Sequence, residues 1–293
     1  MNTLHIFALF NGLVLGMAIF LVSSGLTLAF GILKIFNFAH GAFFMIGAYV
    51  AYTLTGQEAS SLPLFLAAAL VASLVVGSVG VFADLTIFRR LANVPHEYTL
   101  MAAFGIMLFC TGATRILFGQ GVHAVYPPMA IGGFIDVGLP IPLSVYGLFI
   151  IGCGILVLLA LEIGLNRSWY GKVILAVARD PWMANVTGLR VQRVKLVSVA
   201  LSFALAGLAG GLLMANQSLS LDLGHSYLLL AFCAVIVGGL GSVRGAFIAS
   251  LVFGFAESLN AVLLPTMPGI GSYALLILLV LIRPQGIYPE LSQ

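Results

Sequence analysis

Polar side chains that could carry a transport or proton-transfer step interrupt two of the long apolar stretches of this chain. Asn37 and His40 lie beside a glycine-flanked interruption near the amino terminus. Glu257 lies in the middle of a later apolar run, and Asn260 follows one helical turn further on. A carboxylate inside a membrane is costly and normally faces a bundle interior or a water-filled cavity. We therefore predict that these four residues line a substrate pathway.

Two of these residues also allow a structural interpretation. Glu257 would then pair with a neighbouring helix, and His40 would donate a hydrogen bond to a backbone carbonyl freed by a break in its helix. Both interpretations stay open at the level of sequence.

The chain lacks the residue patterns of an enzyme active site. Its serines and five histidines form no nucleophile and base motif. Gly171 and Lys172 resemble the end of a phosphate-binding loop, but Val173 replaces the Ser or Thr that such a loop requires. The three cysteines have spacings that suit neither a metal site nor a disulfide framework. We expect no catalytic residue, no metal and no cofactor of its own, so that any ATP would be bound by partner subunits.

The composition places the chain in a membrane. Hydrophobic residues make up 61% of its 293 positions and charged residues only 7%, which is too little polar surface for a water-soluble globule. Nine apolar runs approach or reach the ~20 residues that a helix needs to cross the hydrocarbon core. They lie near residues 7–30, 38–56, 62–86, 98–118, 143–163, 192–215, 226–243, 245–264 and 270–283. We predict an all-α fold, a polytopic transmembrane bundle of about eight or nine spans that forms one domain over residues 1–293.

When these runs are placed across a membrane in order, almost all Lys and Arg residues lie on the same side of it. Eleven of the twelve fall on that side, and six of them lie between Arg167 and Lys195. Only Arg115 departs from the pattern, near a helix end from which its side chain can reach the headgroups. Positively charged loops stay in the cytoplasm. We therefore predict an outside amino terminus, a cytoplasmic carboxyl terminus and a cytoplasmic loop at about 166–191.

Glycine-rich interruptions break two of the apolar runs, at 31–41 and at 238–247. Non-helical backbone at membrane depth is tolerated only where protein or a water-filled cavity covers it, and paired interruptions in two halves point to a transport pathway. Gly41-Ala42-Phe43 at the end of the first matches Gly245-Ala246-Phe247 in the second, so an internal repeat and a chance match both stay open. Three glycine pairs at i, i+4 spacing predict close approach of helix backbones: Gly12/Gly16, Gly207/Gly211 and Gly241/Gly245.

The predicted cytoplasmic loop contains a short helix whose two ends are both specified. Asp180 is a good N-cap, Pro181 suits the first helical position, and Gly188 suits the left-handed residue that ends a helix. A helix of about two turns is marginal alone in water, and this one would present Trp182 and Val186 on one face. It therefore predicts a docking partner. The alternative is a helix that lies on the inner leaflet with its basic flanks on anionic lipid.

Three segments resemble one known family. They are Gly25 to Ile32 continuing into Asn37-Phe38-Ala39-His40-Gly41, the run Gly238-Gly239-Leu240-Gly241-Ser242 with Gly245-Ala246, and the tail Arg283-Pro284-Gln285-Gly286. Over essentially its whole length the chain is similar to the branched-chain amino acid permease subunits of bacterial ABC importers, and in particular to the first of the two permeases of high-affinity leucine, isoleucine and valine systems. The resemblance implies a single transmembrane permease domain that moves branched-chain or related hydrophobic amino acids across the inner membrane by alternating access.

The resemblance also implies partners. The family works with a second permease subunit, expected to be a different chain, with two ATP-binding cassette subunits and with a periplasmic substrate-binding protein, in contact with membrane lipid and without nucleic acid. The ATPase subunits would contact the loop at 166–191. The coupling residues that this implies are Gly171, Lys172, Arg179, Asp180, Trp182, Met183, Val186 and Gly188.

Two other functions stay open at the level of sequence. The first is an ion-coupled secondary carrier that acts without an ATPase, with Glu257, Glu162 and Asp84 as its coupling carboxylates. Such a carrier does not explain a doubly capped cytoplasmic helix. The second is an ABC permease of the same family for urea or short amides. No feature of the sequence distinguishes such a permease from one for branched-chain amino acids.

Overall fold

The computed structural model describes residues 3–34, 37–58, 61–91, 94–136, 142–267, 269–283 and 286–288, and most of these residues are helical. The helices are α1 (Thr3–Leu33), α2 (Ala39–Thr55), α3 (Leu62–Ala83), the π-helical turn η1 (Asp84–Phe88), α4 (His96–Phe118), α5 (Val145–Asn166), α6 (Trp169–Arg179), α7 (Pro181–Val186), α8 (Val191–Leu213), α9 (Leu223–Gly238), α10 (Val243–Leu263) and α11 (Ile270–Ile282). Strands β1 (Phe134–Ile135) and β2 (Leu143–Ser144) pair antiparallel. The predicted all-α membrane class is confirmed.

Each of the nine predicted apolar runs holds a helix, namely α1 to α5 and α8 to α11. Among the described residues, six helices are long and apolar enough to cross a membrane: α1, α3 with η1, α4, α5, α8 and α10. The other three, α2, α9 and α11, have 17, 16 and 13 residues. At about 1.5 Å per residue these are shorter than the ~30 Å hydrocarbon core. The chain is therefore a multi-pass membrane protein that combines full-length spans with shorter apolar helices.

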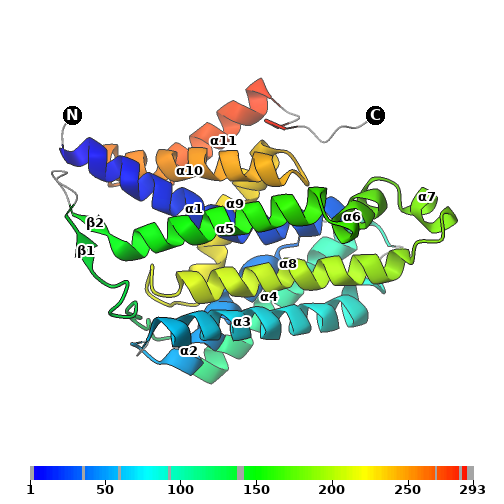
Figure 1. Ribbon diagram of the computed structural model, residues 1–293, viewed down its shortest axis with the longest axis horizontal. Coiled ribbons are helices and arrows are strands. Elements are labelled where there is room, and N and C mark those ends of the chain that lie inside the picture. The colour runs from blue at the N-terminus through cyan, green and yellow to red at the C-terminus, as the bar shows by residue number, and fades with distance from the viewer. Residues whose placement is uncertain are drawn as a thin grey trace.

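The long helices lie side by side along the long axis of the molecule (Figure 1). Helix α1 packs against α5, α6, α8, α9 and α10, and α3 packs against α8 and α2. At one end of the bundle α6 and α7 project from it, and at the opposite end lie the β1–β2 hairpin and the amino terminus (Figure 1). We call these the α7 end and the hairpin end.

Close glycine contacts set the spacing between helices, as the i, i+4 pairs predicted. A Cβ added to Gly207 of α8 would lie 2.6 Å from the carbonyl oxygen of Ala72 on α3, and one added to Gly47 of α2 would lie 2.6 Å from Cα of Gly207. Helices α1 and α10 approach in the same way, since a Cβ on Gly16 would lie 2.9 Å from Cα of Leu251. Real Cβ contacts are essentially never under 3.0 Å. Larger residues at these positions would push the helices apart.

Buried hydroxyl groups join the same helices. Ser258 of α10 donates to the carbonyl of Ala8 at 2.7 Å, and Ser202 of α8 donates to the carbonyl of Gly25 at 2.7 Å. Inside lipid such bonds stabilise helix association by about 0.6 to 2 kcal/mol each. Both acceptors belong to α1, so α1 is tied to α10 near the hairpin end and to α8 nearer the α7 end.

Candidate coupling and translocation sites

The short helix predicted in the loop at 166–191 is present, with both predicted caps. Helix α7 begins at Pro181, and Oδ1 of Asp180 accepts a hydrogen bond from the backbone N–H of Met183 at 2.9 Å. Gly188 has a φ of +86°, a conformation that favours glycine. The local sequence therefore determines this helix almost to the residue.

Helix α7 presents an exposed apolar surface at the tip of the molecule. Ala184 is buried, whereas Trp182 is 72% exposed, Met183 is 51% exposed and Val186 is 64% exposed. We call these three exposed residues the α7 surface. A groove of about 590 Å³ lies between α7 and the start of α8, and its lining residues are Pro181, Trp182, Asn185, Arg190, Val191, Gln192, Arg193 and Lys195. Exposed aromatic and Met side chains beside Arg are typical of protein interfaces.

A second helix, which the sequence analysis did not predict, joins α7 to the bundle. Helix α6 begins after Ser168, whose hydroxyl caps its first turn. Its residue Ala178 packs in a small apolar cluster with Leu28 and Ile32, which belong to the last turns of α1. The N-cap Ser168, followed by apolar residues at helical spacing, was the signal that could have found α6. The α7 surface is thus connected through one short helix to the end of α1.

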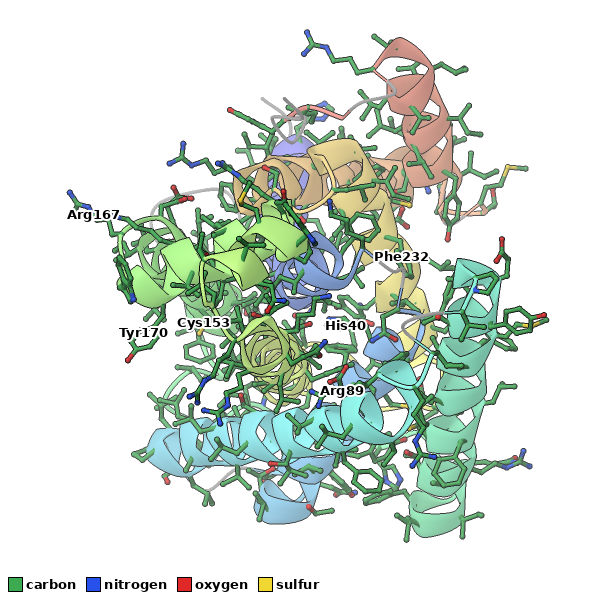
Figure 2. All side chains as sticks on the ribbon, turned by 90° about the vertical axis from the view of Figure 1, so that its right-hand side faces the viewer. His40, Arg89, Cys153, Arg167, Tyr170 and Phe232 are labelled. Carbon is green, nitrogen blue, oxygen red and sulfur yellow. The ribbon has the colours of Figure 1, made fainter. Side chains whose placement is uncertain are left out.

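The remaining predicted coupling residues lie on α6 in two different environments. Gly171 is buried in the elbow between α5 and α6, where an added Cβ would collide with the carbonyl oxygens of Gly164 and Leu165. Lys172 and Arg179 are exposed. Seen from the α7 end, the neighbouring Arg167 and Tyr170 also lie at the edge of the bundle (Figure 2). Gly171 therefore holds the elbow closed, and the two cations face outward.

The predicted interruption after α1 separates it from α2. Lys34 has a φ of 53°, which turns the chain out of the helix, and Ile35 and Phe36 lie outside the described residues. Asn37 is 3% exposed, and its Oδ1 accepts the backbone N–H of Ala39 at 3.1 Å. Such a side chain to backbone bond is typical of the residue that starts a helix. Asn37 therefore organises the first turn of α2.

His40 lies between the helices near the middle of the bundle (Figure 2). It is 0% exposed, and its Nε2 lies 3.2 Å from the carbonyl oxygen of Val22 on α1. Because a carbonyl only accepts, Nε2 carries the proton, and Nδ1 is a buried acceptor with no partner among the residues that the structure describes. The structural role considered for His40, donation to a backbone carbonyl, is thus present, although this carbonyl belongs to an intact turn of α1 and not to the break.

Helices α2 and α9 begin at the same depth and run apart. The backbones of Gly41 and Gly224, near their first residues, are in contact, since a Cβ on either would collide with the carbonyl of the other. Helix α2 runs to the hairpin end, where the hydroxyl of Tyr52 lies 3.4 Å from Nδ1 of His123. Helix α9 runs to the α7 end, where its last residue, Gly238, packs against Gly245. Short helices that begin inside the membrane and are covered by protein occur in transporters.

Glu257 and Asn260 lie together at the turn between α10 and α11. The carboxylate of Glu257 accepts the backbone N–H of Gly269 at 3.2 Å and the hydroxyl of Ser272 at 2.6 Å. Nδ2 of Asn260 donates to the carbonyl of Met267 at 3.0 Å. Because α11 begins directly after Gly269, Glu257 also interacts favourably with the positive end of that helix. Glu257 therefore pairs with a neighbouring helix, as its structural interpretation expected.

The four predicted pathway residues form two separate groups. Ser258, which follows Glu257, bonds to Ala8 of α1, whereas His40 bonds to Val22 of the same helix. Residues 8 and 22 are 14 positions apart on α1, which corresponds to about 21 Å along its axis. The structure brings Asn37 close to His40, and Glu257 close to Asn260, but it does not join the two groups.

Two of the three carboxylates considered for an ion-coupled carrier are in ion pairs. Nε of Arg244 donates to Glu162 at 2.9 Å, and Arg89 lies 3.7 Å from Asp84. Both carboxylates therefore have a structural partner, so a role in ion coupling is not needed to explain their presence.

Comparison with known proteins finds one protein family that matches nearly the whole chain. A family model described as "Branched-chain amino acid transport system / permease component" matches residues 8–282. The high-affinity branched-chain amino acid transport system permease protein BraD of Pseudomonas aeruginosa is 30% identical over 97% of this chain and 96% of that protein, and LivH of Escherichia coli K12 is 31% identical over the same shares. The probable branched-chain amino acid transport permease protein LivH of Methanocaldococcus jannaschii is 30% identical over 91% of this chain and 87% of that protein. No solved structure matches the chain.

Proposed function

Because the chain belongs to the family of branched-chain amino acid transport permease components, we propose that it is the membrane-embedded subunit of an ATP-driven importer that moves branched-chain amino acids across the inner membrane of a bacterium. Its relatives are named as permeases for these substrates. In this assembly it would work with a second, different permease subunit, two ATPase subunits that bind the ATP, and a periplasmic substrate-binding protein. The chain itself would catalyse no reaction.

The observation that carries the proposal is the α7 surface. Trp182, Met183 and Val186 are exposed on a helix of six residues that is too short to be stable on its own. A short helix capped at both ends and projecting from a bundle is suited to fit a cleft in a partner. The proposal therefore places the ATPase at the α7 end, on the cytoplasmic side, where the basic residues of this loop satisfy the positive-inside rule.

Helix α6 supplies the path by which a movement of α7 would reach the bundle. Ala178 packs against Leu28 and Ile32 of α1, and α1 ends one residue before Lys34, where the chain turns toward α2. A displacement of α6 would therefore act on the last turns of α1 and on the break that follows them. Since packed helices move as rigid bodies about such breaks, α2 and α1 would shift relative to each other and open the pathway to alternate sides.

The hairpin end has the features expected of a surface that receives the binding protein. Its long loop presents Met129 and Phe134, which are 98% and 72% exposed. Backbone bridges tie this loop to other connections, through His123 with Leu219 and through Tyr126 with Glu58. A loop fixed at several points keeps its exposed side chains in place, which lowers the entropic cost of docking. We place this end outside the cell.

Cysteine crosslinking tests the proposal. Trp182→Cys and Met129→Cys are introduced separately into a chain whose three cysteines have been replaced by alanine, and each variant is expressed with the ATPase, the second permease and the binding protein encoded with it. A reagent with a maleimide at one end and a photoreactive benzophenone at the other is attached to the cysteine in membrane vesicles, and illumination then crosslinks it to whichever protein or lipid it touches. We expect Trp182→Cys to form a product with the ATPase, and Met129→Cys to form none with it, because the two positions lie at opposite ends of the bundle.

Three results would count against the proposal. Recovery of the Trp182→Cys crosslink only with lipid would mean that α7 lies on the membrane surface. Labelling of Trp182→Cys by an impermeant reagent from outside intact cells would reverse the orientation. Uptake of radiolabelled L-leucine that needs the chain but continues without the ATPase genes would support an ion-coupled carrier instead.

A further inference from the structure

A cavity of about 340 Å³ opens between α1 and α10 toward the hairpin end. It is lined by Phe7, Asn11, Val14, Leu15, Asn216, Glu257, Ser258, Ala261 and Val262. Phe7 is 49% exposed, so the cavity is open at the amino-terminal end of α1. Pockets for small ligands have volumes of about 300 to 1,000 Å³. This cavity is at the small end of that range, a size suited to a single amino acid.

Glu257 brings a negative charge to the wall of this cavity. Among the described residues no Lys or Arg forms an ion pair with it. Its two hydrogen bonds, from Gly269 and Ser272, leave further acceptor positions on the carboxylate free, because an ionised carboxylate has about four. An unpaired charge at this depth is costly. A cationic group that entered the cavity would therefore gain a strong, charge-assisted hydrogen bond.

The opposite requirement, a donor for an anion, is met by two amide side chains. Asn11 has no hydrogen-bond partner in the part of the chain that the structure describes, and it lies three residues after Ala8, on the side of α1 that contacts α10. Asn216 lines the cavity from the connection that follows α8. Neutral amides can donate hydrogen bonds to a carboxylate without the desolvation cost that a buried Lys or Arg would carry.

The rest of the cavity wall is apolar. Val14 and Leu15 contribute from α1, and Ala261 and Val262 from α10. Pockets that orient a small amphiphilic ligand usually combine a few polar groups with an apolar wall. A free amino acid with an aliphatic side chain has an ammonium group for Glu257, a carboxylate for the two amides and a side chain for the apolar residues.

We propose that this cavity is a binding position for the zwitterionic head and aliphatic side chain of a free amino acid on its way through the bundle. Glu257 accepts hydrogen bonds from the α-ammonium group, the amides of Asn11 and Asn216 donate to the α-carboxylate, and the side chain lies against the α1 and α10 wall. The inference rests on the proposed function for the identity of the substrate. It adds Asn11 and Asn216 to the pathway and makes this cavity the first position that a substrate meets from the hairpin end.

Protection of an introduced cysteine tests this assignment directly. Ala261→Cys is placed in the chain free of other cysteines, and the purified assembly in detergent is labelled with a small maleimide at increasing concentrations of L-leucine. We expect L-leucine to slow the labelling. We expect 4-methylpentanoate, which lacks the ammonium group, and 3-methylbutylamine, which lacks the carboxylate, to slow it at least about tenfold less effectively, since each loses a hydrogen-bonded charge.

Variants of the cavity separate binding from a structural role of Glu257. Glu257→Gln and Asn11→Leu are each expected to raise the L-leucine concentration for half protection at least about tenfold. Ser272→Ala is the matched control, because it removes one hydrogen bond from Glu257 without changing the cavity wall, and protection is expected to stay within about twofold of the parent. Each variant is compared by its elution in size-exclusion chromatography and its unfolding temperature, so that loss of the fold is recognised.

Several results would overturn the assignment. These are equal protection by all three compounds, protection by sodium ions in place of choline without any amino acid, and a loss in Ser272→Ala as large as in Glu257→Gln. Uptake by the wild-type assembly separates this inference from the proposed function. Normal ATP-dependent L-leucine uptake with no protection at position 261 rejects the cavity alone, whereas absence of L-leucine uptake rejects the proposed function.

Discussion

Replacement of Trp182 by alanine is the most direct test of the docking role of α7. Trp182 is 72% exposed, and a buried Trp covers about 150–250 Å², so a partner has about 110–180 Å² of it to bury. At about 25 cal/mol per Å² this area corresponds to about 3–4 kcal/mol. The loss of side-chain entropy in the interface offsets part of this free energy. We therefore expect Trp182→Ala to weaken ATPase binding by about 2 kcal/mol, or about 30-fold in Kd.

The assay measures binding of the purified ATPase subunit to the permease in lipid nanodiscs, by biolayer interferometry at several ATPase concentrations. The matched control is Trp169→Ala. Trp169 is 75% exposed but lies at the start of α6, next to α5, where an exposed Trp is expected to contact the membrane interface. We expect its replacement to change the Kd by less than about twofold. ATP hydrolysis stimulated by the loaded binding protein should fall with Trp182→Ala in parallel with binding.

Two outcomes would refute this reasoning. The first is an unchanged Kd for Trp182→Ala, which would mean that α7 does not lie in the interface. The second is an equal loss for both tryptophan variants, which would place the interface along α6 and the membrane surface and not at the tip of α7. A lower unfolding temperature for Trp182→Ala would also count against it, because a side chain so exposed contributes little to folding of the isolated permease.

The remaining predictions concern the helix contacts and caps. Gly210→Ala places a Cβ against a carbonyl of α2 and should lower stability by about 1–3 kcal/mol, seen as a lower unfolding temperature in detergent, whereas Gly105→Ala, with nothing within 4 Å, should not. Asp180→Ala should lower the stability of α7 by about 1 kcal/mol and reduce L-leucine uptake. Asp180→Asn can still cap the helix and should retain uptake. Equal uptake by the two variants would show that the cap is unimportant. Glu162→Gln should leave the unfolding temperature nearly unchanged, because Arg244 is 67% exposed and exposed ion pairs contribute little to stability. A clear coupling energy in a double-mutant cycle with Arg244→Ala would contradict this.

The helices of this fold could be predicted largely from sequence because the signal is local. Each of the nine apolar runs contains a helix, because a backbone inside lipid must form its hydrogen bonds within its own segment. Both caps of α7 were also local, because Asp180 and Gly188 act on residues next to them. The shortness of α2 and α9 was not predicted, because it depends on the contact of Gly41 with Gly224, residues far apart in the chain.

The candidate sites were predictable only in part. Polar residues within apolar runs identified Glu257 and His40, but the sequence contains no information on the partners that decide their roles. Glu257 meets Ser272 across a turn, and Asn11 reaches the same cavity from the other end of the chain. Helix α6 was not predicted, because charged residues are spread along this loop and its apolar face is defined only by contact with α1. Pairing between distant segments is a property of the tertiary structure.

Helix α1 connects the two functional ends of this protein. Its last turns, at Leu28 and Ile32, contact α6, while Asn11 and Val14 line the cavity near its other end. A helix of 31 residues moves as one rod, so a shift imposed at α6 changes the cavity, and a ligand that fixes the cavity restricts the shift. Coupling of this kind is reciprocal. If L-leucine binds in the cavity and the ATPase docks on α7, as we propose, then L-leucine must change the ATPase affinity by the same factor by which the docked ATPase changes the affinity for L-leucine. Asn11→Leu should abolish both effects together.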